Sequence, residues 1–236
     1  MKESRKFTKI LYTLGLSSLI FGLVYFNFGF SFNVVQAQVN YQPGSDYNGL
    51  AVTVSSLPWY AARAAGITSY ILMFLVVIIG TGLTTSYTYK LINPTKAWIV
   101  HKYLSLALGI TLIVHVVSLL FDKFINLTIV EILIPFYSAY NTIFLSLGIL
   151  ALYLLIIIIF SSLFFRLKSP RVWRLLHYLV YLFFILSFFH GVFMGSDTKT
   201  LTMKYIYWIT GSSFFLLLVY RFWLNKRIVK NNSNIG

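Results

Sequence analysis

Long apolar stretches separated by short polar segments dominate the chain. Six of them contain few charged side chains and cover residues 10–32, 65–86, 98–121, 143–165, 172–195 and 202–224. Each has roughly the 20 residues that a helix needs to cross the hydrocarbon core of a bilayer. The pattern predicts an all-α membrane protein built as a six-transmembrane helix bundle.

The first stretch allows two interpretations. Four basic residues precede it, and Val35-Gln36-Ala37 would suit a signal-peptide cleavage site. A signal peptide usually has an apolar region of about 7–15 residues, and this one is longer, so we expect a retained span. The chain then forms a single membrane domain over 1–236: a first span and outer loop (1–56), a helical core (57–225) and a short basic tail (226–236).

Composition excludes a soluble domain. Hydrophobic residues make up 58% of the chain, charged residues only 10%, and the mean hydropathy is +0.81, whereas soluble domains carry about 25% charged residues. The absence of cysteine excludes disulfides and thiolate sites. Only five carboxylates occur, none in the middle of a span and no two close enough in sequence to suggest an acid–base pair. We therefore expect no catalytic side chain on this chain.

The chain has a net charge of +14, and the distribution of its basic residues predicts how it is oriented in the membrane. The charge could suggest nucleic acid, but the basic residues cluster at the ends of apolar stretches, where positive charge marks the cytoplasmic side. Basic clusters in the amino-terminal segment, around 90–96, at 166–174 and in the tail alternate with loops that hold one or two basic residues each. This predicts a multi-pass cell-membrane protein with both termini cytoplasmic, surrounded by lipid and without a nucleic-acid partner. A bacterial plasma membrane is the expected location.

All four histidines lie in two of the predicted spans. His101 and His115 are fourteen residues apart in the third, and His177 and His190 are thirteen apart in the fifth. Both spans run outward from the cytoplasm, so each carries an inner and an outer histidine, separated by ~20 Å at 1.5 Å per residue. Histidine is a common axial ligand of haem iron. The pattern predicts an inner haem on His101 and His177 and an outer haem on His115 and His190, with these four histidines as the metal ligands.

Helical phase fits one pair better than the other. At about 100° per residue, His101 and His115 lie about 40° apart on one face, but His177 and His190 lie about 140° apart. The fifth span therefore needs a tilt, a kink or different rotamers at its two levels.

Other roles for membrane histidines remain open. They could bond to nearby backbone or water, or gate a non-redox channel or carrier by protonation, since histidine titrates near neutral pH. A relay usually includes a carboxylate inside the membrane, and none is present. A purely structural membrane subunit is a third alternative, in which histidine substitutions would change nothing.

At these residues the chain resembles the ferric reductase-like transmembrane domain family. That family includes the haem cores of NADPH oxidases and yeast ferric reductases, and the haem subunit of bacterial methionine sulfoxide reductase. The resemblance covers about residues 57–225 and rests on three segments: Pro58–Gly66 (PWYAARAAG), Trp98-x2-His101-x13-His115 and Trp173-x3-His177-x12-His190-Gly191.

The resemblance implies two b-type haems and electron transfer across the membrane, as an oxidoreductase component. Oxidases continue into a flavin and nicotinamide domain, whereas here no Gly-rich dinucleotide fingerprint occurs. We expect electrons from a separate reductase, a quinol or a partner's FMN, and an outer acceptor such as a ferric chelate, oxygen or a partner reductase.

Two arginines are further candidates for binding the cofactor. Arg63 opens the second predicted span on the outer side and could hold an outer haem propionate, because an arginine fork suits carboxylates. Arg174 lies one turn before His177 and could meet an inner propionate. Both also fit ordinary roles, Arg63 as a snorkelling arginine and Arg174 as cytoplasmic positive charge.

Overall fold

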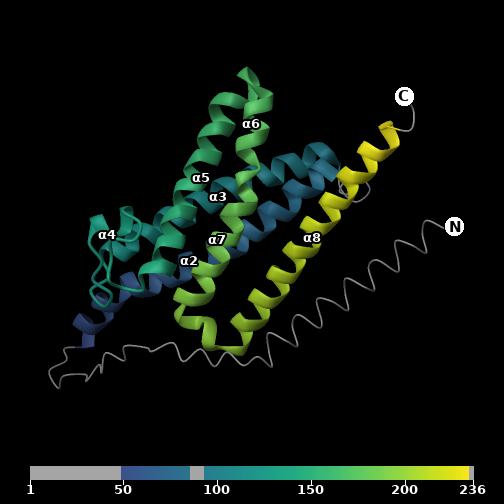
Figure 1. Cartoon of the computed structure of the whole chain (residues 1–236). Coiled ribbons are helices and arrows are strands. Elements are labelled where there is room, and N and C mark those ends of the chain that lie inside the picture. Colours follow the sequence, from purple (N-terminus) through teal and green to yellow (C-terminus); the bar gives the residue numbers. More distant parts are fainter. Residues whose placement is uncertain (1–48, 86–92, 234–236) are drawn as a thin grey trace. The chain divides into compact units, whose positions relative to one another are not determined.

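Every regular element in the part of the chain that the structure describes is helical. The computed structural model describes residues 49–85 and 93–233 (Figure 1). The elements are α2 (Gly49–Thr85), α3 (Pro94–Leu120), the short α4 (Ile129–Leu133), α5 (Thr142–Lys168), α6 (Pro170–His177), α7 (Leu179–Met194), the 3-10 turn η2 (Ser196–Lys199) and α8 (Leu201–Ser233). The all-helical prediction is confirmed for these residues.

Four segments of the described residues are long and apolar enough to cross a membrane. They are Leu57–Thr84, Pro94–Leu120, Thr142–Lys168 and Pro170–Met194. They match the second to fifth predicted spans, although α2 begins well before residue 65. The sixth predicted span lies in α8, which is not among these four. The first predicted span, 10–32, lies outside the described residues, so the six-span count stays a prediction.

Local sequence explains where the central helices begin. The Asn93 side chain accepts a hydrogen bond from the Thr95 backbone N–H at 2.9 Å, and Pro94 occupies the first position of α3. Proline is favoured there because the first helical N–H has no partner within the helix. Pro170 begins α6 in the same way, one residue after α5 ends. Ser169 alone joins α5 to α6, and α6 turns back to pack along α5 (Figure 1).

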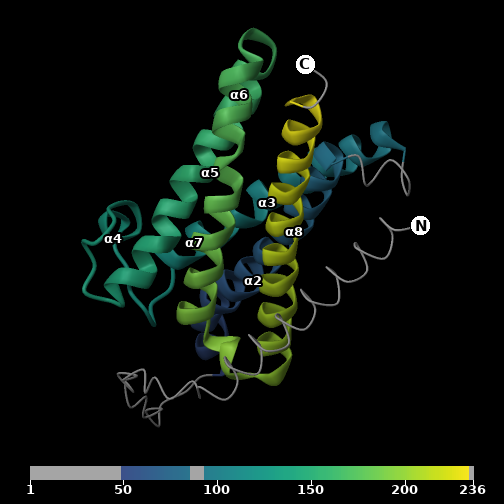
Figure 2. The same cartoon turned by 45° about the vertical axis from the view of Figure 1, so that its right-hand side comes forward.

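The helices pack as two antiparallel sets. α2 packs mainly on α3, and α5 packs on α6 and α7; α2 also contacts α7 and α8. Figure 2 shows α6 and α7 following one another along α5. A hydrogen bond from the Ser69 hydroxyl to the Thr111 hydroxyl, 2.9 Å long, links α2 to α3. The sets therefore bring α3 against α2, and α6 and α7 against α5, so that every histidine-bearing helix packs on a long neighbour.

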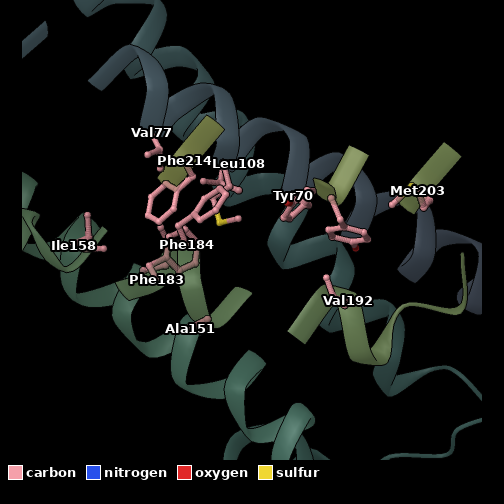
Figure 3. Packing of buried hydrophobic residues seen from close by; sticks show 13 residues of the cluster. Tyr70, Val77, Leu108, Ala151, Ile158, Phe183, Phe184, Val192, Met203 and Phe214 are labelled. Carbon is pink, nitrogen blue, oxygen red and sulfur yellow. The ribbon is translucent and has the colours of Figure 1, made fainter. Parts of the chain in front are cut away.

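An aromatic core joins the two sets. Phe184 on α7 is 1% exposed, and its ring stacks on Phe214 of α8 with 4.1 Å between centroids. Figure 3 shows Leu108, Phe184 and Phe214 together, with Val192 and Met203 farther along the cluster. Burial of such rings is a large stabilising contribution. The core fixes α2, α3, α5, α7 and α8 relative to one another.

The fifth predicted span is interrupted beside its first histidine. α6 ends at His177, Tyr178 is in a turn, and α7 starts at Leu179. The Tyr178 N–H donates to the carbonyls of both Arg174 and Leu175 at 3.2 Å, so the helix tightens locally. This irregularity lies between the two histidines whose spacing does not suit one face of a regular helix.

The segment between α3 and α5 is held by a polar turn around α4. The Thr128 hydroxyl accepts from the Glu131 N–H while the Glu131 carboxylate accepts from the Thr128 N–H at 2.9 Å, a reciprocal cap. The carboxylate also accepts from the Thr128 and Ser138 hydroxyls. These bonds, that from the Thr128 backbone first, lower the pKa of Glu131.

Candidate functional site

The four histidines lie in two pairs. His101 on α3 and His177 at the end of α6 have ring centroids 6.4 Å apart, at an angle of 61°. His115 on α3 and His190 on α7 are close enough to interact electrostatically. These are the pairs that the sequence predicted for the inner and outer levels. Their role as cofactor ligands stays a prediction.

Three of the histidines bond through Nδ1 to a backbone carbonyl of the neighbouring long helix. His115 bonds to the Ala62 carbonyl at 2.7 Å and His101 to the Val76 carbonyl at 3.1 Å, both on α2. His190 bonds to the Phe144 carbonyl on α5 at 2.8 Å. These three bonds determine which ring nitrogen carries the proton.

A carbonyl can only accept, so Nδ1 must carry the proton in each of these three bonds. In a neutral ring Nε2 is then the nitrogen with a free lone pair. Metal-bound histidines commonly donate their other N–H to a carbonyl in this way, which fixes the ring and raises its basicity. The three side chains are thus prepared to bind a metal through Nε2.

A glycine lies under each of these three rings. A Cβ added at Gly66 would lie 3.0 Å from His115 Nδ1, one at Gly80 would lie 2.9 Å from His101 Cε1, and one at Gly148 would lie 2.6 Å from His190 Cε1. Such separations are well inside the ~3.5–4.0 Å of an ordinary carbon contact. The missing side chain is what lets each imidazole reach the carbonyl on the facing helix.

His177 has different surroundings. Its Nδ1 is buried and has no hydrogen-bond partner among the described residues. The Trp173 ring lies 5.3 Å from the His177 ring, one turn earlier on α6. Arg221 of α8 is close enough to act on His177 electrostatically and stacks over Tyr178 at 5.1 Å. The inner pair thus consists of His101, whose Nδ1 bonds to a carbonyl, and His177, whose Nδ1 has no partner among the described residues.

The residues present fit a haem. The described residues contain no group of three or more histidine, cysteine, aspartate or glutamate side chains that could hold a metal. Haem iron needs only two axial ligands from protein, because the macrocycle supplies the other four. Two metal–imidazole bonds of about 2 Å, plus about 1 Å from each nitrogen to its ring centre, separate two centroids by about 6 Å. The inner pair shows 6.4 Å.

An apolar cavity of about 280 Å³ lies between α3 and α5. Gly109, Val116 and Leu155 are among its lining residues; none of the lining residues is polar, and none is one of the four histidines. Val116 adjoins His115 in sequence.

Arg63 has a protein partner. Its guanidinium makes a two-point ion pair with Asp197 in η2, with Nε 3.0 Å from Oδ2, and it lies 4.0 Å over the Trp59 ring. The two side chains are 29% and 24% exposed. The ion pair joins α2 to the turn before α8. A contact between Arg63 and a haem propionate stays a prediction.

Two other arginines lie near His177. Arg174 is three residues before it on α6, and Arg221 of α8 is close enough to act on it electrostatically. Arg174 is exposed, and its Nε donates to the Pro170 carbonyl at 3.3 Å. Arg221 of α8, for which the sequence predicts no site role, donates to the Thr84 hydroxyl and, at 3.3 Å, to the Tyr178 hydroxyl. Nothing in the sequence indicates that Arg221 contacts other helices while Arg174 is exposed.

Comparison with known proteins identifies the scaffold. The family described as "Ferric reductase like transmembrane component" matches residues 65–188, a range that includes His101, His115 and His177 and ends just before His190. No curated protein and no solved structure matches the chain. The family match covers more than half of the chain. The protein therefore belongs to the ferric reductase-like transmembrane components.

Proposed function

We propose that this protein is a di-haem b-type cytochrome that carries electrons across the cell membrane. His101 and His177 would ligate the inner haem, and His115 and His190 the outer haem. The two haems, when bound, supply one-electron redox chemistry. In this proposal the chain has six spans, both termini are cytoplasmic and the membrane is a bacterial plasma membrane.

One observation carries the proposal. Three of the four histidines donate Nδ1–H to a carbonyl, and the four rings lie in two pairs. A bond from Nδ1 to a carbonyl by itself also fits a histidine that only bonds to backbone, but that role gives no reason for the four rings to lie in pairs across helices. The family match supports the same assignment.

The protein residues have defined tasks. Two imidazoles would hold each haem iron, and the haems would supply electron transfer when bound. The carbonyls of Ala62, Val76 and Phe144 orient three of those rings. Arg63 and Arg174 would bind propionates, Arg63 while also paired with Asp197. Aromatic and aliphatic core residues exclude water between the levels.

Donor and acceptor lie outside the chain. We propose a separate donor on the inner side, either a reductase subunit carrying FMN or a membrane quinol. The acceptor on the outer side would be a ferric chelate, oxygen or an extracytoplasmic partner reductase. Copurification with a soluble partner would separate the last acceptor from the first two.

Single histidine substitutions test the assignment. We expect His101→Ala and His177→Ala each to lose the inner haem, and His115→Ala and His190→Ala each to lose the outer, so every variant binds one haem per chain where the wild type binds two. Pyridine haemochrome quantitation on purified full-length protein measures this. A variant that keeps two haems and normal reduction refutes the pairing, and haem-free wild type with pH-dependent ion flux establishes the channel alternative.

A further inference from the structure

A fixed register links the histidines to their supports. The accepting carbonyl and the glycine under each ring are four residues apart: Ala62 and Gly66, Val76 and Gly80, Phe144 and Gly148. On α2 the two supports are fourteen residues apart, matching the spacing of His115 and His101 on α3. The three occurrences are one recurring motif, a carbonyl with a glycine one turn later, which we name the carbonyl–glycine support.

The same step along α5 leads to a fourth position that differs. Fourteen residues after Phe144 and Gly148 come Ile158 and Ser162, so a serine stands where the motif has glycine. The Ser162 hydroxyl donates to the Ile158 carbonyl at 2.8 Å, and Ser161 donates to the same oxygen at 2.8 Å. The carbonyl that would receive a histidine proton is already bonded twice.

Trp173 connects this position to His177. Its indole N–H donates to the Ser162 hydroxyl at 3.3 Å, and its ring lies against the His177 ring. The Nδ1 of His177 is the one histidine Nδ1 in the described residues without a hydrogen-bond partner. The serine and the missing bond therefore occur together.

We propose that Ser162, acting through the Ile158 carbonyl and Trp173, keeps His177 without a hydrogen bond and so sets the potential of the inner haem. This rests on the proposed haem ligation. Donation from Nδ1 makes an imidazole a stronger donor and stabilises ferric iron. The inner site has one such ring and the outer site two, so the missing bond at His177 raises the midpoint potential of the inner haem. Ser162 is a positioning residue that touches neither iron nor substrate.

Ser162→Gly tests the proposal by rebuilding the support. The change removes a hydroxyl from the Ile158 carbonyl and the Cβ from the facing surface, so His177 can approach and donate. A typical hydrogen bond changes an equilibrium by up to about tenfold, which for a one-electron couple corresponds to about 59 mV. We expect the inner midpoint potential to fall by up to this amount, with the outer potential unchanged.

Ser161→Gly is the matched control. It makes the same substitution one residue earlier, removes the other hydroxyl from the same carbonyl and has the same cost in helix propensity. It leaves Ser162 and Trp173 in place, so both potentials should stay at their wild-type values. Redox titration of the purified full chain, followed by visible absorption, measures all three proteins.

The outcomes separate this proposal from the proposed function. An inner potential that is unchanged or raised in Ser162→Gly, or loss of the inner haem from it, overturns the role of Ser162. The sites are assigned from the single-histidine variants. Each of these results leaves the wild type with two haems bound, whereas failure of the proposed function means that the wild type binds none.

Discussion

Gly148→Ala is the substitution whose effect follows most directly from the distances. A Cβ at residue 148 would lie 2.6 Å from both Cε1 and Nδ1 of His190 and 3.0 Å from its Cγ. Ordinary contacts between such atoms are about 3.5–4.0 Å, so the ring must retreat by about 1 Å. That movement lengthens the 2.8 Å bond to the Phe144 carbonyl to about 3.8 Å, where it no longer counts as a hydrogen bond.

The expected loss is large enough to measure. The broken bond is worth about 1 kcal/mol, and removing the partner of a metal-bound ligand typically costs about 10–100-fold in affinity. Alanine returns at most about 1 kcal/mol through its better helix propensity. Most changes in affinity occur in the dissociation rate. We therefore expect the outer haem to leave about 10–100 times faster, with the inner haem unaffected.

Transfer of haem from the purified protein to excess apomyoglobin, followed by absorbance, measures both dissociation rates. Gly211→Ala is the control, because its Cβ would lie 3.0 Å from Cε2 of Phe188, a ring packed against the hydrophobic core. It reproduces the crowding between helices without touching a histidine, so it should keep wild-type rates. Wild-type rates for both haems in Gly148→Ala would refute the argument that the glycine positions His190.

Two further predictions concern the loops. Arg63→Gln and Asp197→Asn should each lower the melting temperature in detergent, and their double-mutant cycle should give a coupling of up to about 1 kcal/mol, since the pair is only partly buried; strict additivity would show that the ion pair does not link α2 to η2. Because the pKa of Glu131 is lowered in the folded protein, its contribution to stability is complete above the unfolded carboxyl pKa and is lost as pH falls through the folded value. Hydrogen exchange of residues 128–134, corrected for intrinsic rates, should show protection lost over that acidic range in the wild type and little pH dependence in Glu131→Gln, and equal pH dependence in both would contradict the cap.

Much of the helical scaffold was predictable because a membrane span is recognised from the apolar composition of its own residues. The apolar stretches at 98–121 and 143–165 match α3 and α5 within a few residues, and Pro94 and Pro170 mark helix starts. The extension of α2 back to Gly49 was missed, because residues 49–64 are less uniformly apolar and include Pro58 and Arg63.

The pairing of the histidines also followed from spacing, since helix rise and orientation assign each ring to a level. What surrounds each ring could not be predicted. The bonds to Ala62, Val76 and Phe144 depend on which face of α2 or α5 meets the histidine helix, and glycines at 66, 80 and 148 read individually as ordinary membrane-helix glycines. The Arg63–Asp197 pair joins residues 134 positions apart, beyond the reach of any local pattern.

The central claim is that four imidazoles hold two haems in one membrane domain. The most direct test is the haem content of the full chain, expressed with sufficient haem and purified in detergent, measured together with its reduced-minus-oxidised spectrum. We expect two haems per chain, with the spectrum of six-coordinate, low-spin b-type haem that does not bind carbon monoxide. Colourless protein that is folded by circular dichroism and does not take up added haem would contradict it.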